Sequence, residues 1–264
     1  MSLDSQALIH ADSWLNAPID KADKLAIEAL KTDDPDGFNE SFYKLLEFGT
    51  GGMRGIMRLG SNGINRYTIG QATQGLANAL KGPDKLSVAI ACDCRINSQH
   101  FAETAANVLA ANGIDVYLFD SLRPTPLLSF ALREKGCDAG IVITASHNPK
   151  AYNGYKVYGK DGGQIVPPQD ADILQSVRNV TIGDILWSGG QGRIHRLGEA
   201  MDQVYINMLE SMQLTKARDL SVVFTSLHGT AITLLPEALK RFGFSQVHVL
   251  ASQAEPDGNF PTVQ

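Results

Sequence analysis

The sequence contains only three cysteines in 264 residues, Cys92, Cys94 and Cys137. An odd count builds no disulfide framework, and a single residue between Cys92 and Cys94 is not the two-residue spacing of a redox or zinc pair. We therefore interpret the thiols as ordinary strand residues. Scarce, unpaired cysteine is typical of a reducing compartment, so we expect a cytoplasmic protein.

Long apolar runs and a surplus of basic residues are also lacking. No run approaches the roughly 18 apolar residues that a membrane-spanning helix needs, and the N-terminus shows no basic-then-apolar signal pattern. The 23 basic and 28 acidic residues give a net charge of −5, which argues against the broad basic footprint of nucleic-acid-binding proteins. We therefore expect neither a membrane nor a nucleic acid as a partner.

The residues that are present give the composition of a folded soluble protein, with 44% hydrophobic and 19% charged residues. The first 48 residues are polar and Ala-rich with helical spacing, and the segment Asp34–Gly37 interrupts them as a turn. We expect residues 1–48 to form a helical arm that packs on the domain after it.

From Gly49 the pattern changes to alternating helices and strands. The spacing predicts helices over 68–80, 98–111 and 125–136, separated by strands over 86–92, 114–119 and 139–145. Regular alternation of this kind is typical of an α/β fold in which helices sandwich a mostly parallel sheet.

The region after residue 146 is richer in glycine. We expect strands within 152–164 joined by a turn at 161–163, then a helix over 169–177. We place a boundary near residue 200, so that 49–199 form one domain and 200–264 part of a second, similar one. The second unit is predicted as helix 200–212, strand 220–225, helix 230–242 and strand 246–250.

The segment Thr144–Pro149 concentrates polar side chains directly after a β-branched strand. In open α/β sheets ligands bind at the carboxyl ends of the strands, which is where Ser146, His147 and Asn148 would lie. One interpretation is an ordinary turn, since Ser, Asn and Pro are common turn residues. The other interpretation is that the Ser146 hydroxyl is catalytic, either as a nucleophile beside a base or as the carrier of a phosphoryl group.

A hydrolase elbow is not supported, because Ser146 is not flanked as Gly-x-Ser-x-Gly. A phosphoryl carrier needs positive charge and amide donors nearby. Asn153–Lys156 and the glycine-rich segment Gly49–Gly55, which includes Arg54, could supply both. A nucleotide-binding domain fits poorly, because no Gly-x-Gly-x-x-Gly follows a strand.

Several segments together resemble the α-D-phosphohexomutase family, which includes phosphoglucomutases, phosphomannomutases and phosphopentomutases. The resemblance runs from about Phe48 to the C-terminus, and the motif sequences are most similar to those of the phosphoglucomutase/phosphopentomutase branch. It is carried by Phe48–Gly55, Asp93–Arg95 with Ser98, Pro124–Pro126, Thr144–Pro149 and Asn153–Lys156.

The resemblance implies a function and a role for each matching residue. A phosphoryl group carried by Ser146 would pass to a sugar monophosphate, and the resulting sugar 1,6-bisphosphate would reorient and return its other phosphate to the serine. His147 would contact the substrate or the phosphoserine, and Asn148 would shape the loop. Lys156 would act in proton transfer or charge balance, and Arg54 would approach the phosphoserine and the substrate.

The resemblance also implies a Mg²⁺ ion that bridges the phosphoserine oxygen of Ser146 and three aspartates of an Asp-x-Asp-x-Asp loop. No such run occurs in the sequence, where Asp257–Gly258 is a single carboxylate in a turn. We therefore expect this sequence to be the N-terminal portion of a longer parent chain. The metal-binding loop, the domain that recognises the sugar hydroxyls and the domain that binds the non-transferred phosphate would lie in the C-terminal domains of that parent chain. We expect the N-terminal portion to be inactive by itself. The alternative is a non-catalytic phosphosugar-binding or interaction module derived from the first domain.

Three further residues are assigned structural roles. His228 lies at a second strand-to-helix turn, and His195 lies in a basic surface loop. For Arg95 the choice is between an ion pair with Asp93 and a contact below the loop that contains Ser146 (residues 146–152, the Ser146 loop), and we favour the ion pair.

Overall fold

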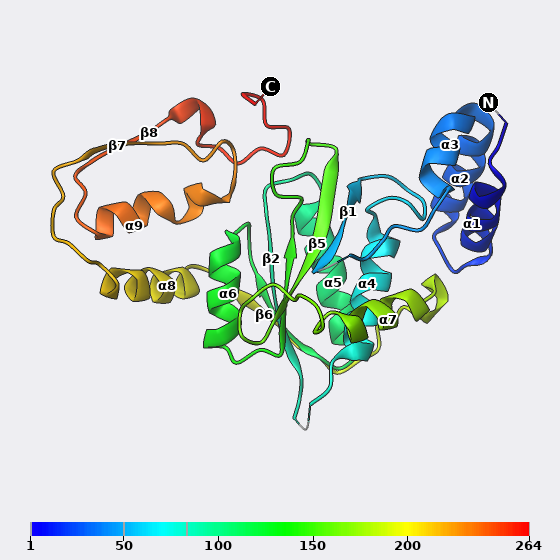
Figure 1. Cartoon of the computed structure of the whole chain (residues 1–264), viewed down its shortest axis with the longest axis horizontal. Coiled ribbons are helices and arrows are strands. Elements are labelled where there is room, and N and C mark those ends of the chain that lie inside the picture. The colour runs from blue at the N-terminus through cyan, green and yellow to red at the C-terminus, as the bar shows by residue number, and fades with distance from the viewer. Residues whose placement is uncertain (1, 50, 83, 264) are drawn as a thin grey trace.

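The computed structural model describes residues 2–49, 51–82 and 84–263 (Figure 1). Three helices form the N-terminal arm: α1 (Ser5–Asn16), α2 (Lys21–Asp33) and α3 (Pro35–Phe42). The predicted turn after residue 33 is the start of α3, because the Asp34 side chain accepts a hydrogen bond from the Gly37 amide and caps the helix.

A six-stranded sheet forms the centre of the chain, in the order β1-β5-β4-β2-β3-β6. Neighbouring strands run parallel in the pairs β4/β2, β2/β3 and β3/β6, and antiparallel in β1/β5 and β5/β4. The predicted α/β class with a mostly parallel mixed sheet is therefore confirmed. The strands are β1 (Gly52–Ile56), β2 (Ser87–Cys92), β3 (Asp115–Phe119), β4 (Ala139–Ile143), β5 (Tyr152–Gly159) and β6 (Ile194–Leu197).

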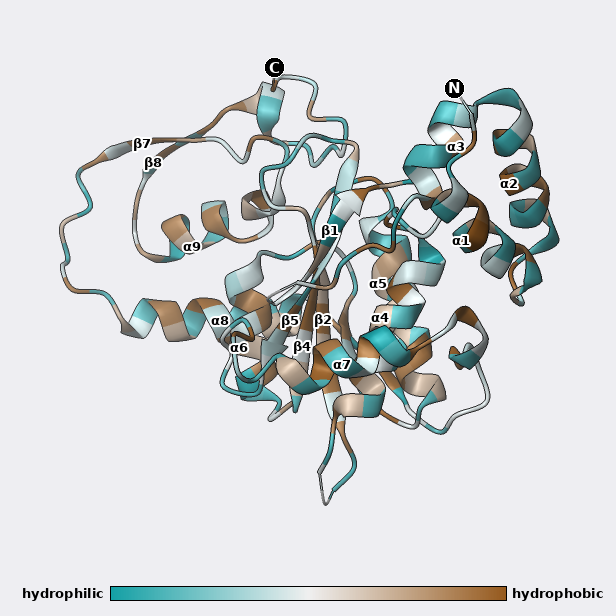
Figure 2. Ribbon diagram, turned by 45° about the vertical axis from the view of Figure 1, so that its right-hand side comes forward, coloured by the Kyte–Doolittle hydropathy of each residue, from teal (hydrophilic) through white to brown (hydrophobic). Residues whose placement is uncertain are grey.

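Helices cover both faces of this sheet (Figure 1). On one face lie α4 (Arg66–Ala79), α5 (Ser98–Ala111) and α7 (Ala171–Asn179), and on the other lie α6 (Thr125–Glu134) and α8 (Glu199–Ser211). Successive strand residues point to opposite faces. Ile141 and Ile143 thus pack in the cluster with α4 and α5, whereas Val142 packs in the cluster with α6. The central strands β2 and β4 are accordingly apolar in sequence, and brown ribbon marks this region at the centre of Figure 2.

Residues 213–263, which we call the smaller unit, follow α8 and lie beside the sheet, at the left of Figure 1. Its strands β7 (Ser221–Phe224) and β8 (Gln246–Val249) make a two-stranded parallel sheet. The predicted helix over 230–242 is divided into η2 (Thr230–Thr233) and α9 (Leu235–Arg241). Pro236 explains the break, since proline has no N–H for a continuing helix but fits a helix's first turn. The short turn η3 (Ala251–Gln253) follows β8.

Two predicted loops are strands. The glycine-rich segment that contains Arg54 is strand β1, which pairs with β5. The basic segment around His195 is strand β6, at the edge of the sheet, where the imidazole stacks on Tyr117 with ring centroids 5.1 Å apart. Conversely, the predicted pair of strands within 152–164 is a single strand, β5. Beyond it only an isolated bridge joins Tyr158 to Gln164.

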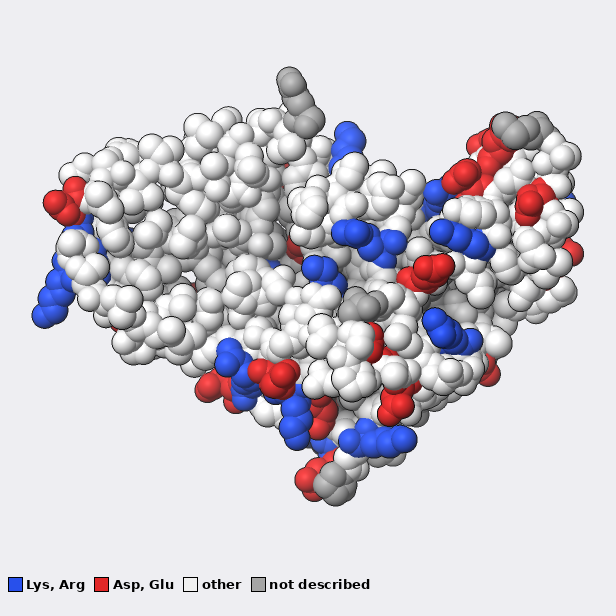
Figure 3. Space-filling view, viewed as in Figure 1, with Lys and Arg blue, Asp and Glu red and all other residues white. Residues whose placement is uncertain are grey.

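Charge is unevenly spread on the face shown in Figure 3. Blue and red side chains alternate over the lower part of the molecule, while the smaller unit at the left shows few of either. That unit exposes apolar side chains instead, among them Leu214, Leu220 and Val223.

Candidate active site at the Ser146 loop

Ser146 lies at the carboxyl end of β4, three residues beyond the last strand residue, and its side chain is exposed although Thr144 and Ala145 are buried. Its backbone has a φ of 57°, in the left-handed region that costs an L-residue about 1–2 kcal/mol. The Ser146 amide donates a 2.9 Å hydrogen bond to the Thr144 hydroxyl, which helps to hold this turn. The local fold thus presents the hydroxyl to solvent on a constrained backbone.

The neighbouring strand β2 ends one residue before Asp93, so its carboxylate reaches the same edge of the sheet. One carboxylate oxygen of Asp93 accepts hydrogen bonds from the Arg95 amide at 2.9 Å and the Ser98 hydroxyl at 2.7 Å. The other accepts from the Thr144 hydroxyl at 2.6 Å. Asp93 therefore ties the start of α5 to the base of the Ser146 loop.

Arg95 combines the two roles between which the sequence left a choice. Its Nε lies 3.3 Å from the Asp93 carboxylate. Its two terminal nitrogens donate to four backbone carbonyls of the Ser146 loop, at 2.6 to 3.0 Å: those of Ser146, Asn148, Pro149 and Tyr152. The ion pair that we favoured is present, and the contact with the loop is present too.

Three of the other candidate residues gather at the tip of the loop. The Ser146 hydroxyl lies 3.2 Å from Nδ1 of His147. Arg54 comes from β1 and donates a 2.9 Å hydrogen bond from Nη1 to the side-chain oxygen of Asn148. The structure therefore brings Arg54, Ser146, His147 and Asn148 together, although Arg54 is 92 residues away from Ser146 (146 − 54) in the sequence.

Lys156 lies on the strand between β1 and β4. It pairs directly with Val142 and Gly52, while Arg54 pairs with Gly154 two residues away along β5. Directly paired residues share a face of the sheet, so Lys156 and Arg54 are diagonal neighbours on the same face. Lys156 is half-buried, and its side-chain ammonium has no hydrogen bond or ion pair with any residue that the structure describes.

This arrangement of β1 and β5 depends on glycine at position 52. Its φ is 149°, and a side chain there would collide with the carbonyl oxygen of Tyr155 on the neighbouring strand. Only glycine allows β1 to approach β5 so closely at this point, which places Arg54 beside the Ser146 loop.

A cavity of about 320 Å³ lies beside the loop and reaches the smaller unit. The loop contributes Ser146 and His147 to its wall, and the smaller unit contributes Gly229, Thr230 and Phe260. Neither Arg54 nor Lys156 belongs to the wall. The complete lining is Asp93, Cys94, Arg123, Thr125, Val142, Thr144, Ser146, His147, Gly229, Thr230 and Phe260.

Arg123 in this wall was not identified from the sequence. It is 7% exposed, and its Nε and Nη2 each donate a 2.8 Å hydrogen bond to one oxygen of Asp202 on α8. A two-point pair of this kind neutralises the guanidinium within the protein. The only signal in the sequence was its position directly before Pro124, at the start of a predicted helix.

The smaller unit also contacts the base of the loop. The Phe260 ring lies over the Arg95 guanidinium, 5.3 Å from its central carbon. His228 is 3% exposed, and its ring nitrogens lie 3.1 Å from the Glu255 carbonyl and 2.9 Å from the Thr262 hydroxyl. These partners hold the C-terminal segment in place, which supports the structural role assigned to His228.

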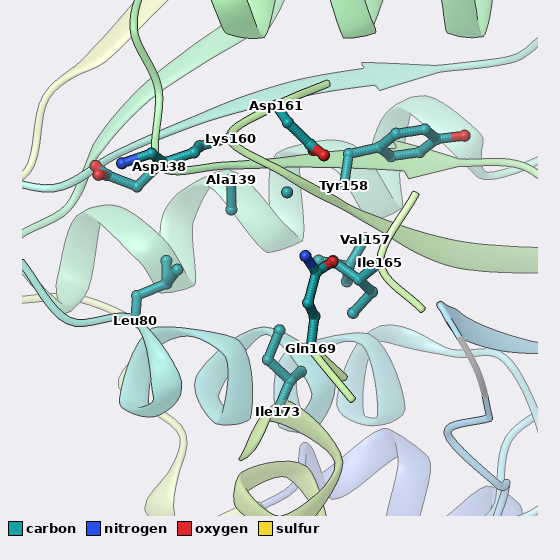
Figure 4. Close-up of a pocket in the computed structure, with 11 residues that line it drawn as sticks. Leu80, Asp138, Ala139, Val157, Tyr158, Lys160, Asp161, Ile165, Gln169 and Ile173 are labelled. Atoms are coloured by element: carbon teal, nitrogen blue, oxygen red, sulfur yellow. The ribbon is translucent and has the colours of Figure 1, made fainter. Parts of the chain in front are cut away.

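A second cavity of about 320 Å³ lies at the opposite end of β4, where the strand begins with Ala139 (Figure 4). Its floor is apolar, with Val157 and Ile165, and its polar side chains include Lys160 and Asp161. None of the candidate site residues lines it.

The described residues hold no evident metal centre. Within residues 2–49, 51–82 and 84–263, no group of three or more His, Cys, Asp or Glu side chains is arranged to bind a metal ion. These residues do not by themselves fit the Mg²⁺ site implied by the resemblance, since Asp93 is already engaged by Thr144, Ser98 and Arg95. The same part of the chain holds no helix long and apolar enough to cross a membrane.

Comparison with family models gives two matches. Residues 45–182 match the phosphoglucomutase/phosphomannomutase alpha/beta/alpha domain I, and residues 203–264 match the alpha/beta/alpha domain II. Together they include the Ser146 loop, the strands β1 to β5 and the smaller unit, while β6 lies between the two matches.

Comparison with whole proteins points in the same direction. The phosphoglucomutase of Staphylococcus aureus (strain N315) is 42% identical over 234 residues, which are 85% of this chain and 42% of that enzyme. That of Staphylococcus haemolyticus is 38% identical over 263 residues, which are 96% of this chain and 47% of that enzyme. The chain thus spans about half the length of the curated relatives that it matches.

Solved structures agree in fold. A Thermus thermophilus protein assigned as a phosphomannomutase superposes with a TM-score of 0.72 at 26% identity, over 84% of this chain and 48% of the other. A phosphoglucomutase/phosphomannomutase family protein from Burkholderia thailandensis gives a TM-score of 0.63 at 26% identity, over 81% of this chain and 45% of the other.

Proposed function

The chain belongs to the phosphoglucomutase/phosphomannomutase family, and on that premise we propose that Ser146 accepts and returns a phosphoryl group in a phosphosugar mutase reaction. The observation that carries the proposal is the presentation of this hydroxyl. It is exposed at the carboxyl end of β4, beside the His147 imidazole, on a loop fixed by Arg95 and Asp93.

The group transfer balances as an exchange of two oxygens at phosphorus. When a sugar bisphosphate phosphorylates the serine, the Ser146 Oγ–P bond forms and the sugar O–P bond breaks. The serine proton ends on the sugar oxygen that is released. The reverse exchange, at the C1 hydroxyl or at the C6 (or C5) hydroxyl of a sugar monophosphate, moves phosphate between the two positions.

The neighbouring side chains support this transfer in different ways. The His147 imidazole is within hydrogen-bond reach of the serine hydroxyl and can take or return its proton. Arg54 is held by Asn148 and keeps its remaining N–H groups for phosphate oxygens. Lys156 carries an ammonium without a partner among the described residues, on the same face as Arg54, where it can balance charge or exchange a proton at the reacting sugar hydroxyl.

Members of this family generally use Mg²⁺, which when bound offsets the charge on the transferring phosphoryl group. The described residues include the phosphate-carrying hydroxyl but no carboxylate cluster for the ion. The roles above are therefore assigned to the chain's own side chains and involve no metal-bound step.

The experiment is to incubate the purified chain with glucose 1,6-bisphosphate and Mg²⁺ and to follow its intact mass. Uptake of one phosphoryl group, mapped by peptide sequencing to Ser146 and abolished in Ser146→Ala, is the expected result. Phosphate on Ser98 or Thr144 instead would refute the assignment. The Ser211→Ala variant is the control, because it removes an exposed hydroxyl at the end of α8 that lies outside the cavity wall.

Two supporting variants test the cations. Arg54→Ala and Lys156→Ala are each expected to lower the rate constant for uptake by about a hundredfold or more, as loss of a preorganised charge donor typically does. Circular dichroism checks that each variant is folded. Phosphate uptake separates a portion of a mutase from a phosphosugar-binding module, because a module binds the sugar phosphate without becoming phosphorylated. In a coupled assay with glucose 1-phosphate we expect no turnover by this chain alone, since its described residues include no carboxylate cluster for the metal ion.

A further inference from the structure

Arg95 donates more hydrogen bonds to the Ser146 loop than any of the candidate residues, yet it does not line the cavity. Its side chain is 2% exposed. Nη1 donates to the carbonyls of Pro149 and Tyr152, both at 2.9 Å, and Nη2 donates to those of Ser146 at 3.0 Å and Asn148 at 2.6 Å. The two terminal nitrogens carry four N–H bonds, so all four are used on one loop, residues 146–152.

From this geometry we infer that Arg95 is the positioning residue of the Ser146 loop: its rigid guanidinium fixes where the serine hydroxyl stands without touching the substrate. The assignment of the hydroxyl as phosphoryl carrier rests on the proposed function. The fixing of the loop does not, because it follows from contacts within the chain.

The planar guanidinium suits this role and an ammonium does not. Four donors in one plane at fixed angles determine the relative positions of four carbonyls, whereas a lysine ammonium is a point charge with three donors. The Nε edge is held by Asp93 at 3.3 Å, so the plane of Arg95 is set from the opposite side to the loop.

Phe260 covers the face of this guanidinium from the smaller unit, 5.3 Å from the central carbon. Hydrogen bonds to a charged donor are stronger when water is excluded, because the local dielectric constant is lower. The smaller unit therefore reinforces the contacts between Arg95 and the loop.

Lys150 provides a direct readout of loop mobility, because it is exposed in the middle of the segment and is followed by Ala151. Trypsin needs an unfolded segment to cut at Lys150, so its rate reports local opening. Losing even one charge-assisted hydrogen bond changes such an opening equilibrium by about tenfold. We expect native-state cleavage at Lys150 to rise by at least about that factor in Arg95→Gln, and by less in Arg95→Lys.

Arg123→Gln is the matched control, since it also removes a buried arginine whose side chain donates four hydrogen bonds, to Asp202, Ser121 and Leu122. It should leave cleavage at Lys150 unchanged. A folded Arg95→Gln protein with cleavage equal to that of the unmodified protein would overturn the inference.

A further measurement needs no Arg95 variant, so it still tests the inference if the Arg95 variants do not fold. In ¹⁵N-arginine-labelled Arg123→Gln protein, one guanidinium should still show separate, slowly exchanging Nη proton signals, because all four of its Nη–H bonds are directed at carbonyls in a buried place. If every guanidinium exchanges rapidly, the arrangement described for Arg95 does not persist in solution and the inference fails.

The link to function is tested by the kinetics of phosphoryl uptake from glucose 1,6-bisphosphate. A misplaced reacting group can lower a rate about a hundredfold without weakening binding. Arg95→Lys should therefore reduce the maximal rate constant and leave the half-saturating concentration unchanged, whereas a lower fraction of folded protein would reduce only the amplitude. An unchanged maximal rate constant overturns the inference. Failure of the unmodified chain to take up phosphate refutes the proposed function instead, and the protease and NMR results then still decide whether Arg95 fixes the loop.

Discussion

Replacement of Asp93 by alanine should be among the most destabilising single changes near the candidate site. The carboxylate accepts hydrogen bonds from Arg95, Ser98 and Thr144 and pairs with the Arg95 guanidinium at 3.3 Å. The side chains of the pair are 16% and 2% exposed, so water cannot replace the lost partner at Arg95. Removing one member of a buried ion pair typically costs about 3–5 kcal/mol.

The three hydrogen bonds are not added to this figure, because the broken pair and the broken bonds share one carboxylate and are not independent. A loss of about 3–5 kcal/mol is a large share of a typical unfolding free energy of about 5–15 kcal/mol. For a chain of this size it corresponds to a fall in Tm of about 6–20 °C.

The assay is urea denaturation of the unmodified protein, Asp93→Ala and Asp93→Asn, followed by circular dichroism. The asparagine variant keeps one oxygen acceptor and should lose less stability than the alanine variant. If Asp93→Ala lowers the free energy of unfolding by less than about 0.5 kcal/mol, the range usual for surface substitutions, the carboxylate does not hold the loop as described.

Three further predictions concern other parts of the site. Ser146→Gly should be more stable than Ser146→Ala by about 1 kcal/mol in the same urea assay, because the φ of 57° strains alanine but not glycine; equal stabilities would contradict the strained backbone. Gly258→Ala should destabilise the contact of the smaller unit, since a Cβ there would lie 2.6 to 3.0 Å from backbone atoms of residues 94–96; increased amide exchange in residues 257–260 would report it, and unchanged exchange would refute it. Burial raises the pKa of the Cys92 thiol to about 12 and that of Cys94 to about 11. The folded protein thus keeps these protons at a pH where unfolded thiols have lost them, so the free energy of unfolding should fall as the pH rises above about 8.5. The buried Cys92 thiol should also react slowly with iodoacetamide at a pH of about 8 until the protein is unfolded, and fast labelling of Cys92 in the native protein would show that it is not buried.

Much of the fold could be predicted from the sequence because its signals are local. The apolar runs that become β2, β3 and β4 and the helical spacing of α4, α5 and α6 lie within single segments, and their predicted bounds differ from the observed ones by no more than two residues. The strand β1 was not predicted, because its glycines resemble a loop and its pairing partner β5 lies about a hundred residues later.

The same distinction applies to the candidate site. Ser146, His147 and Asn148 were found because they are contiguous and follow a recognisable strand. The role of Arg95 could not be resolved, since its four acceptors are backbone carbonyls, which every residue has and which leave no trace in the side-chain sequence. The partner of Arg123 is Asp202, 79 residues away, and no local pattern connects them.

The four cations around the Ser146 loop divide into two kinds. Arg95 and Arg123 are both less than 10% exposed. The terminal nitrogens of Arg95 donate to loop carbonyls, and those of Arg123 donate to Asp202, Ser121 and Leu122. Arg54 is exposed, and its side chain makes a single hydrogen bond, to Asn148. Lys156 is half-buried, and its ammonium has no hydrogen bond or ion pair among the described residues. A guanidinium whose terminal nitrogens are occupied can fix a backbone but has no terminal donor left for an incoming phosphate, whereas a cation with open donors can bind one. Arg95 therefore sets the position of the Ser146 loop, while Arg123 joins α8 to the sheet through Asp202. In the proposed function, Arg54 and Lys156 are the cations with donors left to attract a phosphorylated sugar.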